Sequence, residues 1–535
     1  KKMLSVSNSL PVSNYATSVV SLASGTTFKP KSNGKIRIDL PSSLGMIDFH
    51  SSYLQFKMKV VPPPSSQDAT ANDRLDVYNM EFSNNQGCEQ VIRDLRVLVD
   101  NKPVEEIQHY NILHKFKKDF TDDNSKNALD STFNHAELGR DTDNTHGTFT
   151  HSQNSSTPAV SYDNIGLTQI AKLDCSGVLS LPIGFPVLAT GKVGIEITLE
   201  DADRVLKPKG EFTNLPCEDS TTTAGGTMTH LDISYRNGGT RYDGYGWTNA
   251  NDTPFAKGNT VSITATTAGT GTVTGTPIIT NCQVTGGRVR ISFADILGGA
   301  GGNAQAITAV KVTALVGQTH VGTTRAIQYD YEISDVEYII RSIEMPPPYL
   351  QSLQKRIQQN AFMMDIPTYS SYLDNIQSGM RQQSINIPCF NSRVKTVLSV
   401  PLGSSTTPYN DNRSGLIDNL RNFQAQIGTR REPSRPIDLT NTTNSVAQYP
   451  SQEYLHELKK LFKANGDGVR TLLNWRDNFA FGRSLSAMGG SEDLSDKGFR
   501  FNVEYNADPV AKNVHTFVYH VKRLQVSPQG LQIYQ

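Results

Sequence analysis

Alternation of apolar and polar side chains is the main signal in this chain, and it predicts β-strands. Tyr53–Val61 reads YLQFKMKVV, in which leucine, phenylalanine and methionine share one face while glutamine and two lysines share the other. That period of two is typical of a strand with one buried face. Pro62–Pro64 end this strand, because proline has no N–H to donate to a ladder. Further strands are predicted at Lys35–Leu40, Val91–Val99, Val104–Ile107, Val178–Pro182, Val193–Glu200, Tyr329–Met345, Ile366–Leu373, Ser384–Ile387, Val394–Val400, Phe423–Ile427, Phe499–Tyr505, Val514–Ser527 and Leu531–Tyr534.

Helical spacing is rare by comparison. Tyr110–Phe120 carries its apolar side chains at intervals of three and four, which predicts a short amphipathic helix. Ser451–Phe462 predicts the clearest helix, with Ser451 as its N-cap. Tyr349–Gln359 predicts a third, which follows Pro346–Pro348, because proline is tolerated at a helix start. Few, short helices among many strands predict an all-β fold with helices at the ends of sandwiches.

The strand pattern occurs twice in outline. Val91–Ile107 is a strand-like run, a polar turn and a second run, and a comparable arrangement returns at Val394–Val400 and Asn422–Gly428. Each half then closes with a long β-run, Tyr329–Met345 in the first and Val514–Ser527 in the second. We therefore predict two all-β modules in tandem, with the helix after the triple proline as their junction.

Long polar segments interrupt the first module. Asp122–Asn164 is rich in Asn, Asp and Thr and predicts a long surface loop. Lys207–Arg325 is rich in Thr and Gly but contains alternating runs, and we interpret it as a β-rich insertion carried on one loop. The predicted organisation is an N-terminal arm at 1–30, a first module at 31–348 with the insertion at 207–325, and a second module at 349–535.

Two further expectations follow from these patterns. Leu98 and Val397 lie in comparable strands, and both are expected to face a sandwich core. Removal of residues 210–322 is expected to leave the modules folded, on the premise that both ends of the insertion leave adjacent strands.

Composition narrows the class of protein. Lys and Arg together number 51, as do Asp and Glu, so the net charge is zero. A dedicated nucleic-acid binder needs a clustered basic surface, so this balance disfavours that class, and it does little to oppose self-association. No apolar run reaches the roughly 18 residues of a membrane span, and we expect no secretion signal. The five cysteines are far apart and are expected to be free thiols: Cys88, Cys175, Cys217, Cys282 and Cys389.

A search for catalytic and metal-binding motifs finds none. The chain has no phosphate-binding GxxxxGK[ST], no HExxH or CxxC pair and no GxSxG elbow. Gly298–Gly302 lacks the lysine of a phosphate loop and predicts a surface turn. His135, His146 and His151 share one polar loop, and we favour a surface loop over a metal site there.

The carboxylates give no acid–base pair either. Asp119, Asp122 and Asp123 resemble part of a calcium loop but lack its glycine and its terminal glutamate. Glu105 and Glu106 are adjacent on a predicted strand, so their side chains point to opposite faces and cannot act together. We therefore expect no catalytic, cofactor-binding or metal-binding residues, no cofactor, and a protein that is not an enzyme.

The order of several strings along the chain resembles one family. The first half reads IRIDLPSSLGMIDFHSSYLQFKMKV, CEQVIRDLRVLVDNKPVEEIQHYN, GKVGIEITLEDADRVL and YEISDVEYIIRSIEMPPPYLQSL. The second half reads RVKTVLSV, FQAQIGTRREPSRPI and FVYHVKRLQVSPQGLQIY. In this order the strings resemble the double jelly-roll major capsid proteins of virophages, polinton-like viruses and adintoviruses. The resemblance covers most of residues 30–535, apart from the insertion.

The resemblance implies two eight-stranded jelly-roll sandwiches in tandem, with short helices and a large β-rich loop insertion. It implies a structural protein of a DNA virus, whose homotrimers have a pseudo-hexameric outline and tile an icosahedral capsid. The loops at 122–164 and 207–325 would form outward towers, and the arm would run along the inner face. Implied partners are other copies of the chain, penton and minor capsid proteins, an internal membrane and a host receptor contacted through the towers, without sequence-specific nucleic acid. The implied location is the capsid of the virion, assembled inside the infected host cell.

Two other classes of protein remain open. A β-rich viral receptor-binding spike or fibre head would also suit Thr- and Gly-rich loops and zero net charge. A carbohydrate-active enzyme with two sandwiches would need paired carboxylates in an aromatic-lined cleft. Only two tryptophans occur, Trp247 and Trp475, and no such pair can be assigned. Two comparable halves favour the capsid protein.

Overall fold

A computed structural model gives the architecture of the chain. It describes residues 14–21, 25–61, 80–82, 87–120, 148–149, 167–208, 217–219, 229–234, 236–237, 240–241, 261–267, 271–285, 288–294, 307–314, 330–360, 362–403, 415, 417–439, 451–465, 479–486 and 489–534.

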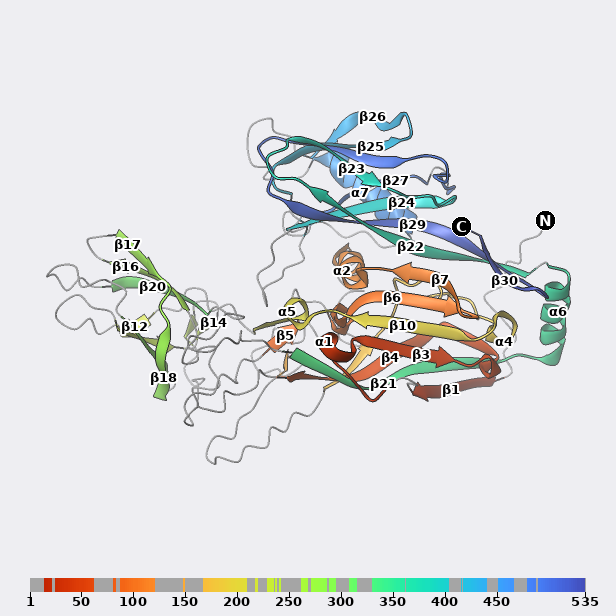
Figure 1. Cartoon of the computed structure of the whole chain (residues 1–535), viewed down its shortest axis with the longest axis horizontal. Coiled ribbons are helices and arrows are strands. Elements are labelled where there is room, and N and C mark those ends of the chain that lie inside the picture. Colours follow the sequence, from red (N-terminus) through yellow and green to blue (C-terminus); the bar gives the residue numbers. More distant parts are fainter. Residues whose placement is uncertain are drawn as a thin grey trace.

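The first half forms a sandwich of two antiparallel sheets (Figure 1). One sheet has the strand order β1-β21-β4-β9, with β2 also paired to β21, and the other has the order β3-β10-β6-β7. The strands are β1 (Asn14–Ser21), β2 (Thr27–Phe28), β3 (Lys35–Leu40), β4 (Met46–Val61), β6 (Ile92–Val99), β7 (Lys102–Ile107), β9 (Leu167–Ala171), β10 (Val193–Leu199) and β21 (Asp330–Glu344).

The second half repeats this architecture. Its sheets have the orders β22-β29-β24-β27, with β30 added to β29, and β23-β28-β25-β26. The strands are β22 (Phe362–Ile376), β23 (Gln382–Ile387), β24 (Val394–Gly403), β25 (Leu420–Ile427), β26 (Arg430–Asp438), β27 (Phe481–Ser484), β28 (Phe499–Tyr505), β29 (Lys512–Ser527) and β30 (Gly530–Tyr534).

Both sandwiches have jelly-roll topology. The eight sandwich strands of each half can be lettered B to I in chain order, with β1 and β2 together as B and with β30, the addition to β29, left out. Both halves then give one sheet B-I-D-G and one sheet C-H-E-F. These strand orders define the jelly roll. The predicted fold class, an all-β chain with two jelly-roll sandwiches in tandem, is confirmed. Part of the predicted arm, Asn14–Ser21, pairs with β21 as strand β1, while the exact domain limits stay a prediction.

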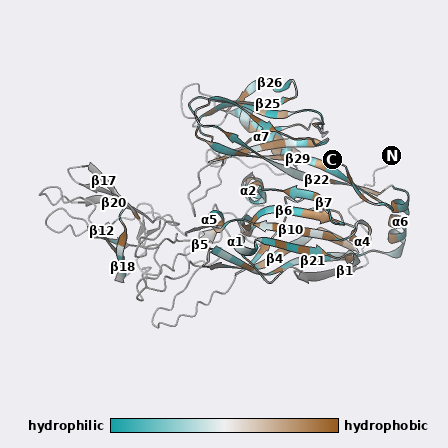
Figure 2. Cartoon of the chain, in the orientation of Figure 1, coloured by the Kyte–Doolittle hydropathy of each residue, from teal (hydrophilic) through white to brown (hydrophobic). Residues whose placement is uncertain are grey.

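The core follows from the alternation. In β21 the buried Ile333 and Tyr338 point inward, while the polar residues between them face out. Val397 is completely buried in the core, as predicted. Leu98 is also buried, at 7% exposure, but it lies outside the main core cluster: Val97 and Val99 enter that cluster, so Leu98 points to the opposite face of its sheet. Figure 2 shows this mixture of hydrophobic and hydrophilic positions along the strands.

The three predicted helices are present as α2 (Tyr110–Phe120), α6 (Pro347–Gln358) and α7 (Gln452–Asn465). Ser451 caps α7, since its Oγ accepts a hydrogen bond from the Tyr454 N–H at 3.0 Å. α2 and α7 both connect strand F to strand G of their sandwich, and α6 joins the two halves. Shorter elements are α1 (Pro30–Asn33), α4 (Val187–Thr190), α5 (Ala202–Val205), and the 3₁₀ turns η1 (Ser42–Leu44) and η3 (Cys88–Val91).

The two sandwiches have the same polarity. β21 runs into α6 at one end of the first sandwich, and β22 starts from α6 and pairs antiparallel to β29. Strands I of both halves, β21 and β29, therefore run toward the α6 end (Figure 1). As a consequence, the D–E, F–G and H–I connections of both halves leave at the end opposite α6.

The insertion forms β-sheets of its own beyond that opposite end (Figure 1). Its strands in the described residues pair with one another, and the premise about its ends is wrong, because it leaves β10 and β21, which lie in different sheets. A small sheet β11-β5-β8 takes one strand from each long connection of the first sandwich. These strands are β5 (Met80–Phe82), β8 (Thr148–Phe149), β11 (Leu206–Pro208), β12 (Cys217–Asp219), β13 (His230–Ser234), β14 (Arg236–Asn237), β15 (Thr240–Arg241), β16 (Val261–Thr267), β17 (Gly271–Gly275), β18 (Ile279–Thr285), β19 (Arg288–Phe293) and β20 (Ile307–Ala314).

Candidate functional site: the junction of the sandwiches

The two sandwiches meet where the edge strand β7 of the first lies against β22 of the second and is hydrogen-bonded by Lys522 of β29 (Figure 1). Lys522 Nζ donates a hydrogen bond to the carbonyl oxygen of Val104 at 2.9 Å, and Lys102 Nζ donates one to that of Leu531 at 2.6 Å. Ser371 Oγ donates to the carbonyl oxygen of Gln108 at 2.8 Å. An edge strand presents unpaired backbone groups. Here side chains of the second sandwich donate hydrogen bonds to the carbonyl oxygens of Val104 and Gln108. The contact therefore satisfies backbone groups at this edge of the first sandwich.

A carboxylate is buried in the first sandwich close to this contact. Glu105 is 1% exposed and accepts hydrogen bonds from the Ser176 hydroxyl, from the Gly177 N–H at 2.7 Å and from the Val178 N–H at 3.2 Å. Burial raises the pKa of Glu105 despite these donors, and burial lowers the pKa of Lys522, whose ammonium is attracted by Glu105. The predicted strand Val178–Pro182 is wrong, because this segment forms turns whose backbone binds the carboxylate.

Gly177 explains how closely the two halves approach. A Cβ on this residue would overlap the carbonyl oxygen of Pro367, in the second sandwich. That neighbour is backbone and cannot rotate away, so any side chain at this position would push the sandwiches apart.

Helix α2 is enclosed at the junction. Seven consecutive residues, from Tyr110 to Phe116, are buried, which covers the whole circumference of a helix with 3.6 residues per turn. Just before it, the rings of His109 and His515 lie 4.5 Å apart at 79°. Near its end, Lys117 Nζ lies 6.0 Å from the centre of the Tyr369 ring. His515 and Tyr369 belong to strands β29 and β22 of the second sandwich, so the face formed by these strands meets the helix near both of its ends.

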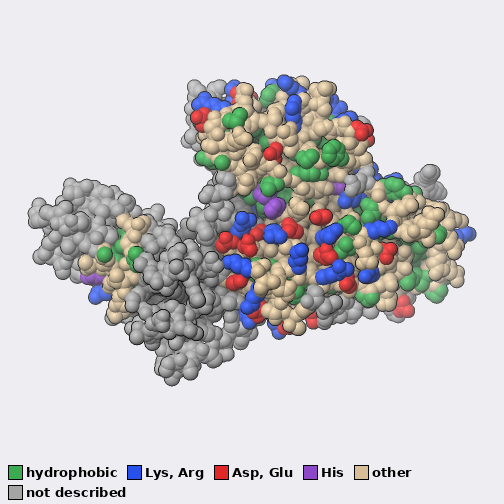
Figure 3. Space-filling model, viewed as in Figure 1, with side chains coloured by type: hydrophobic (Ala, Val, Ile, Leu, Met, Phe, Trp, Pro, Cys, Tyr) green, Lys and Arg blue, Asp and Glu red, His purple; other side chains and the backbone are tan. Residues whose placement is uncertain are grey.

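The outer face of the C-H-E-F sheet in the first sandwich carries a ladder of ion pairs. Arg37 Nη1 lies 3.0 Å from Glu196 Oε1, and Arg96 Nη1 lies 3.5 Å from Glu196 Oε2. Arg96 Nε lies 4.0 Å from Glu106, which is 58% exposed. Basic and acidic side chains are interspersed over this part of the surface (Figure 3). Exposed pairs of this kind contribute little to stability, so the ladder defines a solvated, charged wall.

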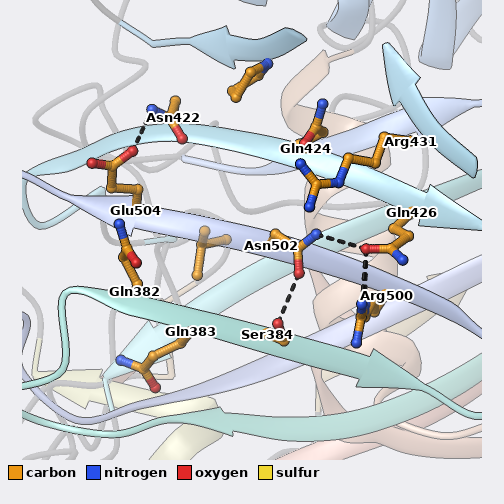
Figure 4. Close-up of a pocket in the computed structure, with 12 residues that line it drawn as sticks. Gln382, Gln383, Ser384, Asn422, Gln424, Gln426, Arg431, Arg500, Asn502 and Glu504 are labelled. Carbon is orange, nitrogen blue, oxygen red and sulfur yellow. Dashed lines mark hydrogen bonds between the residues drawn. The ribbon is translucent and has the colours of Figure 1, made fainter. Parts of the chain in front are cut away.

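The corresponding face of the second sandwich has a different chemistry. A hollow of about 420 Å³ lies over β23, β28, β25 and β26 and is lined mainly by amides (Figure 4). Ser384 Oγ donates to Asn502 Oδ1 at 2.7 Å, and Asn502 Nδ2 and Arg500 Nη2 donate to Gln426 Oε1 at 3.2 and 2.9 Å. Glu504 is the only carboxylate in the lining, so the hollow has no acid–base pair. The two equivalent faces therefore differ: one carries a ladder of ion pairs, and the other carries mainly amide side chains with Arg431, Arg500 and Glu504 among them.

The structure accounts for the sequence-predicted site residues as follows. Glu105 is buried and its neighbour Glu106 is exposed, which confirms that they face opposite ways. Cys88, Cys175 and Cys389 are buried thiols, Cys282 is a partly buried one, and none of these four forms a disulfide. Outside the described residues, or with side chains that are not described, lie Asp119, Asp122, Asp123, His135, His146, His151, Cys217, Trp247, Gly298–Gly302 and Trp475.

Two searches concern the described residues alone. Within them, no three His, Cys, Asp or Glu side chains are grouped closely enough to hold a metal ion. No helix in that part of the chain is long and apolar enough to cross a membrane.

The junction itself was not predicted from the sequence. Lys522 and Glu105 occupy polar positions of alternating strands, where such residues usually face solvent. The one available signal was Gly177, a glycine between Ser176 and the run Val178–Pro182 that was predicted as a strand. A glycine there indicates a close backbone approach.

Comparison with known proteins gives structural likeness only. No protein-family model matches the chain, and no curated protein matches it in sequence. The capsid protein Vp54 of PBCV-1, fitted into a reconstruction of the virophage Sputnik, is 8% identical with a TM-score of 0.46, over 98% of this chain and 97% of that one. The Faustovirus major capsid protein is 9% identical with a TM-score of 0.46, over 96% and 90%. The mavirus major capsid protein is 9% identical with a TM-score of 0.36, over 98% and 91%. The jelly-roll assignment follows from the strand orders of this chain itself.

Proposed function

We propose that the chain is a structural major capsid protein, three copies of which form a ring with a pseudo-hexameric outline that tiles an icosahedral virus shell. The observation that carries the proposal is the pair of jelly rolls with identical strand orders and the same polarity. A threefold ring of such chains presents six similar walls, so that one building block can contact up to six neighbours. Closed rings fix the trimer, and repeated contacts between rings extend the shell.

The rigidity of the junction supports this role. A tile keeps its outline only if its two sandwiches hold a fixed relative orientation. Gly177 allows the backbones to touch, and Lys522 and Lys102 bond backbone carbonyls across the contact. The enclosed helix α2 adds apolar contact on the same side. The buried apolar residues of both sandwiches also belong to one continuous cluster, whereas domains that move freely meet through small, polar interfaces.

The placement of the long connections supports an orientation in the shell. The D–E, F–G and H–I connections of the first sandwich all leave at the end opposite α6, and the insertion projects beyond it (Figure 1). In a layer of upright sandwiches such segments fit only above or below the layer. We propose that they form the outward towers and that the α6 end faces the interior.

The proposed partners follow from this position. Other copies of the chain come first, followed by penton and minor capsid proteins, an internal membrane near the α6 end and a host receptor at the towers. The proposed location is the capsid of the virion, assembled inside the infected host cell. The proposal gives the chain no enzymatic activity and no sequence-specific contact with nucleic acid.

The receptor-binding spike or fibre head is the second candidate. The insertion favours it, because β12–β20 form sheets separate from both sandwiches and project from the body. It gives no reason, however, for two sandwiches of the same polarity joined through a rigid contact.

Assembly separates the two candidates. Purified chain is concentrated at neutral pH and imaged by negative-stain electron microscopy. A capsid protein is expected to give closed shells or sheets with a hexagonal lattice, alone or with co-expressed penton protein. Discrete particles that bind host cells and never form a lattice would support the spike and contradict the capsid role.

A further inference from the structure

Two helices occupy equivalent places in the two sandwiches but differ in their surroundings. α2 lies between strands F and G of the first sandwich, β7 and β9, and α7 lies between strands F and G of the second, β26 and β27. α2 is buried around its whole circumference, and the B–I face of the second sandwich meets it near both ends, through His515 at His109 and Tyr369 at Lys117.

α7 is buried on one side only. Its inner side packs on its own sandwich, where the Tyr454 hydroxyl donates to the Ala480 carbonyl at 2.6 Å and Leu461 lies over Gly482. Its other side is exposed along a single helical stripe with spacings of four, three, one and three residues. The exposed residues are Gln452, His456, Lys459, Lys460 and Lys463.

The adjoining F strands differ in the same way. In β7, Val104 and Glu105 are both buried although they point to opposite faces, and Lys522 bonds the Val104 carbonyl. In β26 only Ile437 is buried, and the strand carries two prolines. Prolines and charged side chains on an edge prevent a further strand from pairing with it. A partner of β26 must therefore pack on it with side chains, as β22 and β29 pack on β7.

The surface equivalent to the one that covers α2 is open on the first sandwich. It is the outer face of β4 and β21, where Gln55, Lys57 and Lys59 stand opposite Glu337, Ser334 and Glu332 in register. Lys57 and Asp335 form an ion pair on this face with side chains that are 51% and 61% exposed.

We infer that the stripe of α7 together with β26 docks on the outer β4–β21 face of a second copy of this chain. Within one chain, the F–G side of the first sandwich lies on the B–I face of the second. The inferred contact is its counterpart, with the F–G side of the second sandwich on the B–I face of the first. Alternation of the internal and the external contact closes a ring after three chains and six sandwiches.

The internal contact is the argument for a second copy as the occupant. It shows that the F–G side of one sandwich fits the B–I face of another. Within one chain, the B–I face of the first sandwich and the F–G side of the second remain without such a contact. The inference rests on the proposed function, because it locates the contact that the proposed trimer needs.

Charge reversal on the stripe tests the inference. The double variant Lys459→Glu, Lys463→Glu keeps the inner side of α7 intact, so its melting temperature and circular dichroism should match those of the wild type. The new carboxylates are repelled by Glu332, Asp335 and Glu337 of the opposite face, a repulsion that Lys57 and Lys59 offset only in part, and the Kd for chain association should rise by about 10-fold. The matched control is Lys355→Glu on α6, which is equally exposed on a helix outside the contact. Mass photometry over a dilution series gives the oligomeric state. A folded double variant that stays trimeric at wild-type concentrations overturns the inference.

Cross-linking between differently substituted chains gives an independent readout. Chains with Lys459→Cys are mixed with chains carrying Gln55→Cys, Lys57→Cys or Glu337→Cys, and treated with a short bismaleimide. At least one mixture should give a cross-linked dimer, and mixtures of the same three chains with Lys355→Cys chains should give none. A trimeric wild type without any such cross-link contradicts the inference but leaves the proposed function standing, whereas a wild type that is monomeric at every concentration contradicts the proposed function itself.

Discussion

The ammonium of Lys522, in the second sandwich, donates a hydrogen bond to the carbonyl oxygen of Val104, in the first, at 2.9 Å. Burial lowers the pKa of this lysine, and the carboxylate of Glu105 counteracts that effect. This lysine therefore contributes to both sandwiches through one hydrogen bond. It covers an unpaired backbone group and fixes the second sandwich against the first.

Replacement of Glu105 should weaken the first sandwich at its contact with the second. Glu105→Ala leaves the Ser176 hydroxyl and two buried N–H groups without their acceptor. Buried donors left unbonded are costly, so the free energy of unfolding should fall by about 3 kcal/mol. Glu106→Ala, at the exposed neighbour, should change it by less than about 0.5 kcal/mol. Thermal unfolding and limited proteolysis near α6 measure both, and equal effects of the two variants would refute the role given to Glu105.

A pair of matched substitutions tests the facing of the strands. Val397→Asp places a carboxylate without a partner in the core and should abolish soluble protein or cost more than about 4 kcal/mol. Leu98→Asp places the carboxylate at a buried position, 7% exposed, on the face of the sheet that Leu98 shares with the partly exposed Arg96, and should cost less than Val397→Asp, about 2 kcal/mol. Soluble yield and urea unfolding give the comparison. Equal losses for both variants would mean that Leu98 faces the core after all.

His520 should make stability depend on pH. It is buried with its Nε2 atom 2.8 Å from Ser370 Oγ, and burial, with Lys522 and Arg393 nearby, lowers its pKa to about 3. Between that value and the ordinary pKa of about 6.5, the unfolded chain binds a proton that the folded chain does not. Stability should therefore fall as the pH falls, by about 2 kcal/mol between pH 7 and pH 5 from this residue.

The variant His520→Gln removes this titration. Its melting temperature should fall less steeply between pH 7 and pH 5 than that of the wild type, while His50→Gln, at an exposed histidine, should behave like the wild type. An unchanged pH slope in His520→Gln would show that this imidazole is protonated in the folded chain.

Deletion of residues 210–322 should leave both sandwiches folded. The reason is that the insertion strands in the described residues pair among themselves, in sheets that contain no strand of either sandwich. With a short Gly-Ser linker in place of the insertion, the melting temperature and the oligomeric state should stay close to those of the full chain. Insoluble protein, or loss of the trimer, would show that the insertion is part of the structural core.

Period-two alternation predicted most of the long strands because their two faces meet different media. It failed where tertiary contacts change that rule. Asn14–Ser21 is rich in Ser, Thr and Val with weak alternation, and was read as an arm although it forms β1 beside β21. β26 was missed because its prolines and arginines are unusual in a strand and are tolerated only at an edge.

The junction escaped prediction for a related reason. Lys522 and Glu105 are charged residues at alternating polar positions, and only the approach of a second sandwich buries them. The helical spacing of Tyr110–Phe120 predicted one buried face of α2, but no local pattern indicates that the opposite face is buried as well. The sequence contains no recognised catalytic or metal-binding motif, so the proposed function rests on how the two sandwiches are arranged. That arrangement depends on contacts between residues far apart in the sequence.

The central claim is that two sandwiches of the same polarity in one chain let a threefold ring imitate a hexagon. Cryo-electron microscopy of the purified full chain, with its mass from native mass spectrometry, tests it most directly. The account predicts three times the 58.8 kDa of one chain and class averages with six lobes around a threefold axis. A particle with the mass of a single chain, or a ring in which the two sandwiches of each chain do not alternate around the axis, would contradict it.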